Sequence, residues 1–274
     1  MSETVYLGID LGTSRTSITT SLGLRETVWS FVGYPKDHVA MKKFGGRSII
    51  YGQEAVENRL ALDLHRPLAG GSIKVKGVED SSETKTAVKD LLEHIVSLAN
   101  VPKEKNIFAV IGAPAEASTD GKGAILKAAK DCMDAVIVCS EPFAVAYGLD
   151  FLDDTLVIDI GAGTVDLCRV HGTMPAKEDQ RTHNVAGDAV DKAISELLTK
   201  SLPDAQFSIN MIKTWKEKYA TLFEGWGDEG RTIVNVPHKG KPLPTDITNE
   251  LYGGCKTMIP PTVEALQDLI ATYD

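Results

Sequence analysis

The sequence predicts an α/β fold in which two similar domains follow one another along the chain. Continuously apolar segments alternate with amphipathic helical segments, which predicts mainly parallel sheets covered by helices. A strand that ends in Asp-x-Gly occurs at residues 5–10 and again at residues 156–160, so one design occurs twice. A length of 274 residues is also enough for two ordinary domains with their own cores.

In the first half, strands are expected at 5–10 and 16–21, separated by a short polar turn that permits a hairpin. Glycine-broken β pieces then predict a small inserted subdomain at about 25–80. Residues 80–99 predict a helix, because apolar side chains recur on one face and Asp80-x-x-Glu83 resembles a capping box. The apolar face consists of Val88, Leu91, Leu92, Ile95, Val96 and Ala99. The next expected elements are a strand at 107–111, a helix at 121–131, a strand at 135–138 and a helix at 141–149.

In the second half, the repeated design predicts strands at 156–160 and 165–170, again separated by a short turn. The remaining expected elements are helices at 188–200 and 207–222, short β pieces within 225–248, and a last helix at 262–272. We therefore expect a first domain at residues 1–153 and a second at residues 154–274.

Composition excludes several classes of protein. The chain has 29 Lys and Arg against 38 Asp and Glu, a net charge of −9 and a pI of about 5.2. This balance argues against a general nucleic-acid binder, which needs a basic surface. No apolar stretch approaches the roughly 20 residues that span a membrane, and the first residues do not resemble a secretion signal. We therefore expect a cytoplasmic protein without direct transmembrane anchoring.

The repeated strand–Asp–x–Gly turn has a use in phosphate binding. Glycine lets the backbone approach a ligand closely, and successive N–H groups in a tight turn can bind an anion. Asp10 and Asp159 would repel phosphate, so they are expected to bind a Mg²⁺ that bridges the phosphates. One such turn could be an ordinary β-turn, but two at matched strand ends favour a shared di- or triphosphate site.

Three segments together carry a family resemblance. Residues 10–14 (DLGTS), 140–148 (SEPFAVAYG) and 159–166 (DIGAGTVD) resemble, in order, the first phosphate, first connecting and second phosphate motifs of the actin, heat-shock-70 and sugar-kinase superfamily. Within it, the chain is most similar to prokaryotic actins, including those that organise magnetosomes. The resemblance implies duplicated actin-like, ribonuclease H-like domains that flank a nucleotide cleft.

The resemblance also implies roles for individual residues. Asp10 and Asp159 match the Mg²⁺ carboxylates, and Asp159 counts with Glu141 as catalytic. Glu141 matches the carboxylate that positions the attacking water, although a carboxylate at a helix start can also serve only the helix dipole. The residues that match the phosphate-binding turns are Gly12, Thr13, Ser14, Gly161, Ala162, Gly163, Thr164 and Gly187.

Two expectations concern the nucleoside. Lys216 and Glu217 resemble a Lys-Glu pair that contacts adenosine and ribose, but such a charged stretch can also be the solvated face of a helix. The family's second domain normally continues with a strand, a glycine-rich adenosine turn and a final helix. Here Gly253-Gly254-Cys255 precedes the last expected helix, and no such turn follows it. The second domain is therefore expected to be incomplete at its C-terminal side.

The function implied is that of an ATP-binding, slowly ATP-hydrolysing protein that polymerises into cytoplasmic filaments, alongside magnetosomes. Self-association, adaptor proteins of the magnetosome membrane and a complete actin-like homologue are the implied partners. One alternative is a truncated, non-catalytic partner that binds or caps a homologue's filaments. A heat-shock-70-like chaperone or a sugar kinase is a further alternative, but the sequence lacks the chaperone's substrate domain and shows no polar sugar pocket.

Overall fold

The computed structural model describes residues 4–68, 82–223 and 230–271. It divides into two compact units, residues 1–182 and 183–274, and each is described by itself. The domain boundary expected between residues 153 and 154 falls inside the first unit and stays a prediction.

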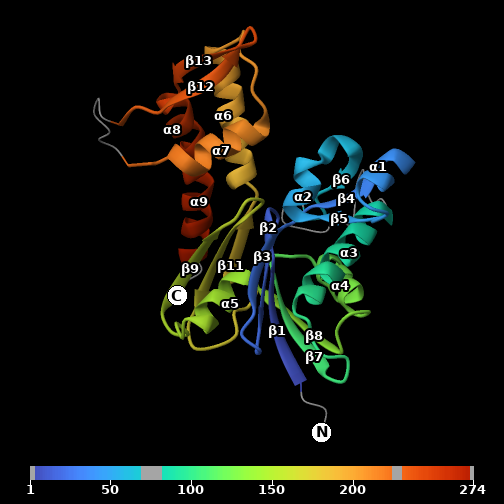
Figure 1. Cartoon of the computed structure of the whole chain (residues 1–274). Coiled ribbons are helices and arrows are strands. Elements are labelled where there is room, and N and C mark those ends of the chain that lie inside the picture. Colours follow the sequence, from blue (N-terminus) through green and yellow to red (C-terminus); the bar gives the residue numbers. More distant parts are fainter. Residues whose placement is uncertain (1–3, 69–81, 224–229, 272–274) are drawn as a thin grey trace. The chain divides into compact units, whose positions relative to one another are not determined.

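The first unit contains a five-stranded sheet in the described residues, with the order β3-β2-β1-β7-β8 (Figure 1). Its strands are β1 (Thr4–Leu11), β2 (Arg15–Thr20), β3 (Arg25–Trp29), β7 (Asn106–Ala113) and β8 (Ala135–Ser140). β1 pairs antiparallel with β2 and parallel with β7, while β7 pairs parallel with β8. The expectation of a mainly parallel sheet is wrong, because the short turns that join β1, β2 and β3 allow only antiparallel pairing.

One face of this sheet is covered by α3 (Ser82–Leu98) and α4 (Thr119–Ala129), as the shared core shows. All six residues of the predicted apolar helix face are buried, which confirms the helix, while Asp80 of the expected capping box lies outside the described residues. The opposite face carries Tyr6 and Val110 at 60% and 43% exposure. In the part of the chain that the structure describes, helices therefore cover one face of this sheet.

A small subdomain follows β3, and the bounds of about 25–80 expected for it stay a prediction. It has a three-stranded sheet with the order β5-β4-β6 and its own core around Phe44, Ile50 and Leu62. An N-cap begins its first helix, because the Asp37 carboxylate accepts hydrogen bonds from two backbone N–H groups. Its elements are β4 (Val32–Pro35), α1 (His38–Lys43), β5 (Ile50–Tyr51), α2 (Gly52–Glu57), η1 (Arg59–Ala61) and β6 (Leu62–His65).

The first unit also contains the repeat of the opening design. β9 (Thr155–Ile160), β10 (Val165–Val170) and β11 (Gln180–His183) form a sheet with the order β11-β10-β9. β9 and β10 pair antiparallel, as β1 and β2 do. Helix α5 (Glu141–Gly148) lies against this sheet, where Ala146 packs into one cluster with strand residues. The predicted duplication of strand, turn and strand is confirmed.

The second unit is mainly helical and has a hairpin (Figure 1). Its core joins Ile194, Ile212, Trp215 and Leu251. The elements are α6 (Gly187–Ser201), α7 (Ile209–Tyr219), β12 (Ile233–His238), β13 (Lys241–Asp246), α8 (Thr248–Lys256) and α9 (Ile259–Ile270).

Helix α8 is absent from the sequence-based expectation, which placed Gly253-Gly254-Cys255 only as a segment before the last helix. The structure gives a packing reason for both glycines. A Cβ on Gly254 would lie 2.2 Å from Ile194 Cγ1, and one on Gly253 would lie 3.1 Å from Leu197 Cδ1. The two glycines thus allow α8 to approach α6 closely, at the cost of a weaker intrinsic helix propensity.

Candidate nucleotide site

The first predicted phosphate turn, at Gly12–Ser14, directly follows β1. A Cβ on Gly12 would lie 2.5 Å from the Arg15 carbonyl oxygen, so only glycine fits the turn as built. The Ser30 hydroxyl donates a hydrogen bond to the Gly12 carbonyl at 2.6 Å, and Arg66 Nε donates one to the Thr13 carbonyl at 2.9 Å. These two hydrogen bonds, from side chains outside the turn, hold the Gly12 and Thr13 carbonyls and so fix the conformation of the turn.

The second predicted turn, at Gly161–Thr164, repeats this geometry between β9 and β10. The Gly161 N–H donates to the Thr164 carbonyl at 2.9 Å. A Cβ on Gly161 would lie 3.1 Å from the same Thr164 carbonyl oxygen. Thr164 is three residues after Gly161, just as Arg15 is three residues after Gly12. Gly163 and Thr164 are buried and Ala162 is partly exposed. Both predicted phosphate turns therefore have glycine at the same place, and the clearance is smaller at Gly12 than at Gly161.

Four carboxyl groups gather near the ends of these strands. In the pairing of β1 with β7, Asp10 lies opposite Gly112, and a Cβ on Gly112 would meet Glu141 Cγ at 3.0 Å. This places Glu141, the first residue of α5, beside Asp10. Asp159 lies opposite Asp166 in the pairing of β9 with β10, so both side chains lie on one face of that sheet.

The electrostatics of this carboxyl cluster (Asp10, Glu141, Asp159, Asp166) follow from burial and from like charge. Desolvation, followed by repulsion from the other three carboxylates, raises the pKa of Glu141 to about 8. Desolvation and the charge of Asp159 raise the pKa of Asp10, although part of its side chain reaches solvent. Desolvation and Asp166 likewise raise the pKa of Asp159. The cluster is thus a site where negative charge is concentrated and poorly compensated.

Asp166 was not among the predicted site residues. It is buried, and its Oδ1 accepts hydrogen bonds from the Ala115 N–H at 2.7 Å and the Thr182 hydroxyl at 2.6 Å. The signal was present, because Asp166 ends the 159–166 motif and stands opposite Asp159. Ser30 and Arg66 were also missed, and their distance in sequence from the turn gives no local signal.

Two of the three predicted site residues of the second unit, Gly187 and Lys216, contact one another. Lys216 Nζ donates a hydrogen bond to the Gly187 carbonyl at 2.8 Å and forms an ion pair with Asp191 at 2.7 Å. Glu217 is about half exposed and pairs with Lys213 at 3.8 Å along α7. Glu217 therefore has the contacts of a solvated helix face, whereas Lys216 is held at the start of α6.

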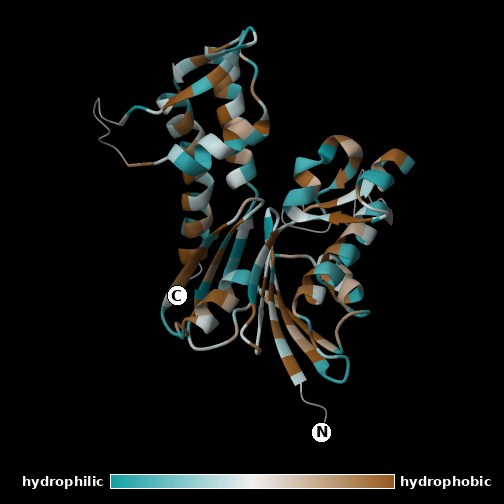
Figure 2. Cartoon of the chain, in the orientation of Figure 1, coloured by the Kyte–Doolittle hydropathy of each residue, from teal (hydrophilic) through white to brown (hydrophobic). Residues whose placement is uncertain are grey.

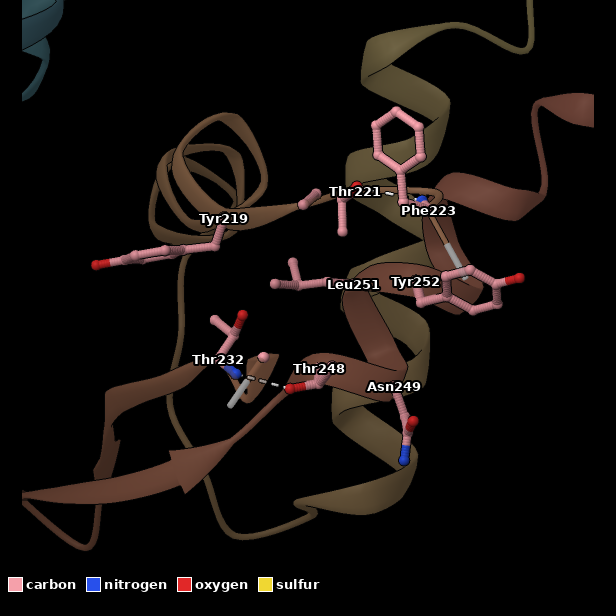
Figure 3. A pocket seen from close by; sticks show the side chains of 10 residues that line it. Tyr219, Thr221, Phe223, Thr232, Thr248, Asn249, Leu251 and Tyr252 are labelled. Atoms are coloured by element: carbon pink, nitrogen blue, oxygen red, sulfur yellow. Dashed lines mark hydrogen bonds between the residues drawn. The ribbon is translucent and has the colours of Figure 1, made fainter. Parts of the chain in front are cut away.

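A separate pocket of about 270 Å³ lies in the second unit, and Figure 3 shows the side chains that line it. Tyr219, Phe223 and Tyr252 contribute rings, and the Thr248 hydroxyl accepts a hydrogen bond from the Thr232 N–H at 2.7 Å. None of the predicted site residues lines it, so it is not part of the predicted phosphate site.

Among the described residues, no group of three or more His, Cys, Asp or Glu side chains is arranged so that it could hold a metal ion. No helix in the described ranges is long and apolar enough to cross a membrane.

Comparison with known proteins identifies the family. The sequence profile described as MreB/Mbl protein matches residues 4–211, and the chain therefore belongs to the MreB/Mbl family of actin-like proteins. Among the curated relatives, it is 38% identical to the actin-like protein MamK of Magnetospirillum gryphiswaldense over 98% of this chain and 72% of that protein. It is 37% identical to MamK of Paramagnetospirillum magneticum, over 98% of this chain and 75% of the relative.

Solved structures agree with this assignment. A MamK double helical filament matches with a TM-score of 0.93 and 35% identity, over 99% of this chain and 81% of the other. A non-polymerising MamK mutant bound to AMPPNP matches with a TM-score of 0.71 and 35% identity, over 100% of this chain and 82% of the other. MreB5 of Spiroplasma citri bound to ADP is 20% identical with a TM-score of 0.78, over 99% and 80% of the two chains, and shows the shared fold. The predicted actin-like fold is confirmed.

Proposed function

We propose that this chain binds ATP with Mg²⁺ at the two Asp-x-Gly turns and hydrolyses it slowly, with Glu141 orienting the attacking water. The observation that carries the proposal is the carboxyl cluster, which lies beside both glycine turns. The AMPPNP- and ADP-bound relatives support nucleotide as the ligand.

The two glycine turns have the geometry to bind the phosphates of the nucleotide. Gly12 and Gly161 leave room for the backbone to approach phosphate oxygens, and the turn N–H groups supply donors without side-chain bulk. Hydroxyl groups of Thr13, Ser14 and Thr164 add further donors. Because Ser30 and Arg66 fix the first turn before a ligand arrives, little ordering is required on binding.

The carboxyl cluster fits a magnesium ion. Hard oxygen donors are what Mg²⁺ prefers, and it commonly takes only one or two carboxylates together with water and phosphate. Asp10 and Asp159 would hold the ion, which when bound supplies charge neutralisation at the phosphates. Desolvation and then like-charge repulsion raise the pKa of Asp10 and Asp159, and a cation at this place would offset both.

Glu141 would act on water. Its carboxylate oxygens accept hydrogen bonds from a water molecule and hold one lone pair of that water toward the terminal phosphate. In the metal-free protein its pKa of about 8 keeps it largely protonated at neutral pH. Neutralisation of the neighbouring carboxylates favours the ionised form, so hydrolysis is expected only when the site is loaded.

The nucleoside end and the assembly are further parts of the proposal. The family resemblance proposes Lys216, Glu217 and Gly187 as further contacts to the sugar, base or phosphates. The MamK filament structure supports self-association of this chain into filaments. By analogy with prokaryotic actins that organise magnetosomes, we propose cytoplasmic filaments beside magnetosomes, linked to them by adaptor proteins of the magnetosome membrane.

The test combines sedimentation with phosphate release. Purified chain with Mg-ATP should pellet and release phosphate, and Glu141→Ala should abolish release while it still pellets. Glu83→Gln, which changes an exposed acid in the first turn of α3, is the matched control. Undiminished phosphate release by Glu141→Ala would contradict its role. No ATP binding, together with binding to filaments of a complete MamK, would instead favour the non-catalytic partner.

A further inference from the structure

The ammonium group of Lys216 is held by two groups of helix α6. Lys216 lies on α7, and its Nζ donates a hydrogen bond to the Gly187 carbonyl oxygen at 2.8 Å. The same Nζ lies 2.7 Å from Asp191 Oδ1, and only 16% of the Lys216 side chain is exposed. Apolar residues of both helices meet in one core, while hydrophilic residues interrupt them along each helix (Figure 2). Lys216 therefore adds a polar contact to the apolar packing of α6 against α7.

The carboxylate of Asp191 depends on Lys216 for compensation of its charge. Asp191 is 3% exposed, and its Oδ1 is buried without a hydrogen bond of good geometry, so the ion pair is what compensates this oxygen. Desolvation raises the pKa of Asp191, and Lys216, followed by Lys213, acts against that increase. Burial of an unpaired carboxylate is strongly unfavourable. If Lys216 turned away to bind a ligand, Asp191 would lose this ion pair or take up a proton.

The contact lies at the first turn of α6, which begins without a side-chain cap. In α7, by comparison, the Ser208 hydroxyl accepts a hydrogen bond from a free backbone N–H at the helix start. The residue before α6 is Ala186, whose methyl group offers no acceptor. Gly187 and Asp191 are four residues apart, so they lie on one side of α6, and both contact Lys216. The start of α6 is thus fixed by a side chain from another helix.

The ion pair also explains why a lysine is tolerated at this end of a helix. The N-terminal end of a helix carries partial positive charge, which disfavours a nearby cation. Asp191, together with Asp188 in the first turn, brings negative charge to the same end. The acidic residues therefore make this a favourable place for the ammonium group of Lys216.

We infer that Lys216 is a positioning residue, with Asp191 as its counter-charge, and that it acts on the nucleotide through the start of α6 instead of contacting the nucleoside. The inference rests on the proposed function, in which Gly187 is a phosphate contact. With its ammonium group bound to Gly187 and Asp191, Lys216 holds the backbone at Gly187 in place before the phosphates bind. Glu217, the next residue, is about half exposed and pairs with Lys213, so it belongs to a different contact.

The test compares Mg-ATP with Mg-tripolyphosphate, which carries the same phosphates without a nucleoside. Both are titrated calorimetrically into the wild type, Lys216→Met and Asp191→Asn. Loss of positioning should lower the affinity for both ligands by the same factor, about fivefold or more, the low end of typical coupling between sites. Lys192→Met, which changes an exposed lysine of α6, is the matched control and should leave both affinities unchanged.

The double variant Lys216→Met with Asp191→Asn shows whether the two residues act as a pair. It leaves neither charge buried alone, so it keeps the test decisive if a single variant fails to fold. Its loss of affinity should be no larger than the larger single loss, whereas independent residues would give additive losses in free energy. Hydrogen exchange in the nucleotide-free protein should be faster at residues 187–191 in all three variants.

Three results would overturn the inference. The first is weaker binding of Mg-ATP by Lys216→Met with unchanged binding of Mg-tripolyphosphate, which would make Lys216 a nucleoside contact. The second is tighter binding of both ligands by Asp191→Asn, which long-range charge alone would produce. The third is unchanged affinity of every variant for both ligands. A wild type that binds neither ligand would contradict the proposed function, and the exchange measurement would still decide whether Lys216 holds the start of α6.

Discussion

Replacing Glu141 by Gln should stabilise the metal-free protein, and the gain should grow with pH. The pKa of Glu141 is raised from about 4.5 to about 8 by desolvation and by Asp10, Asp166 and Asp159. The folded protein thus binds this proton more tightly than the unfolded chain does. Its contribution to stability is complete below about pH 4.5 and is lost as the pH rises toward about 8.

The size of the effect follows from about 1.4 kcal/mol per pH unit. At pH 7 the Glu141 carboxyl is ionised in the unfolded chain and largely protonated in the folded protein. The free energy of unfolding of the wild type is therefore about 3 kcal/mol lower at pH 7 than below pH 4.5, as far as this group is concerned. Above pH 8 the loss reaches its upper limit of about 5 kcal/mol. A glutamine is always neutral and avoids this loss.

The assay is urea denaturation followed by circular dichroism between pH 5 and pH 9, with EDTA and without nucleotide. The free energy of unfolding of Glu141→Gln should exceed that of the wild type by an amount that increases across this range. Glu83→Gln should show no such increase, because Glu83 is exposed at the start of α3. A Glu141→Gln protein that is equally or less stable at every pH would refute the proposed crowding of carboxylates.

Three further substitutions test the packing and the turn. Gly254→Ala should lower the free energy of unfolding by about 1–3 kcal/mol, because its Cβ would meet Ile194 Cγ1 at 2.2 Å. In α4, a Cβ added by Gly123→Ala would meet no atom within 4 Å, so this variant should raise the free energy of unfolding by about 0.5–1 kcal/mol. Thermal denaturation measures both variants, and an equal change in stability for Gly254→Ala and Gly123→Ala would contradict the packing argument. Ser30→Ala removes the donor to the Gly12 carbonyl, so it should lower the free energy of unfolding by about 1–3 kcal/mol and weaken ATP binding. Unchanged stability in urea denaturation and unchanged affinity in calorimetric titration would contradict this.

The predictable part of the fold depends on local patterns. The α3 face from Val88 to Ala99 follows the helical period, and all its apolar members are buried. The strand–turn–strand at residues 156–170 follows from glycine at a tight turn between apolar runs. Such signals lie within a few residues of the element that they specify, so one sequence is enough to detect them.

The parts that could not be predicted depend on contacts between distant residues. Gly253 and Gly254 have the composition of a turn, and only the proximity of Ile194 explains why they stand inside a helix. Ser30 and Arg66 support the first phosphate turn from residues that carry no motif. The expectation of a mainly parallel first sheet was wrong, although the hairpin of residues 5–10 and 16–21 was expected, because apolar content indicates burial and says nothing about the direction of a neighbouring strand.

For the candidate site, motif matching located the turns and Asp10, Glu141 and Asp159. It did not identify the electrostatic cost of placing these groups together with Asp166. That cost arises from strand register, since Asp159 and Asp166 face each other across β9 and β10.

The central claim is that both Asp-x-Gly turns hold the phosphates of one nucleotide. Calorimetric titration of Mg-ATP into the wild type, Gly12→Ala and Gly161→Ala tests it most directly, with Gly123→Ala as the control. The added Cβ atoms would lie 2.5 Å and 3.1 Å from backbone carbonyl oxygens of the two turns. We predict one site in the wild type and a loss of affinity in both turn variants, larger for Gly12→Ala. Unchanged affinity in either variant, with the fold intact by circular dichroism, would contradict the account.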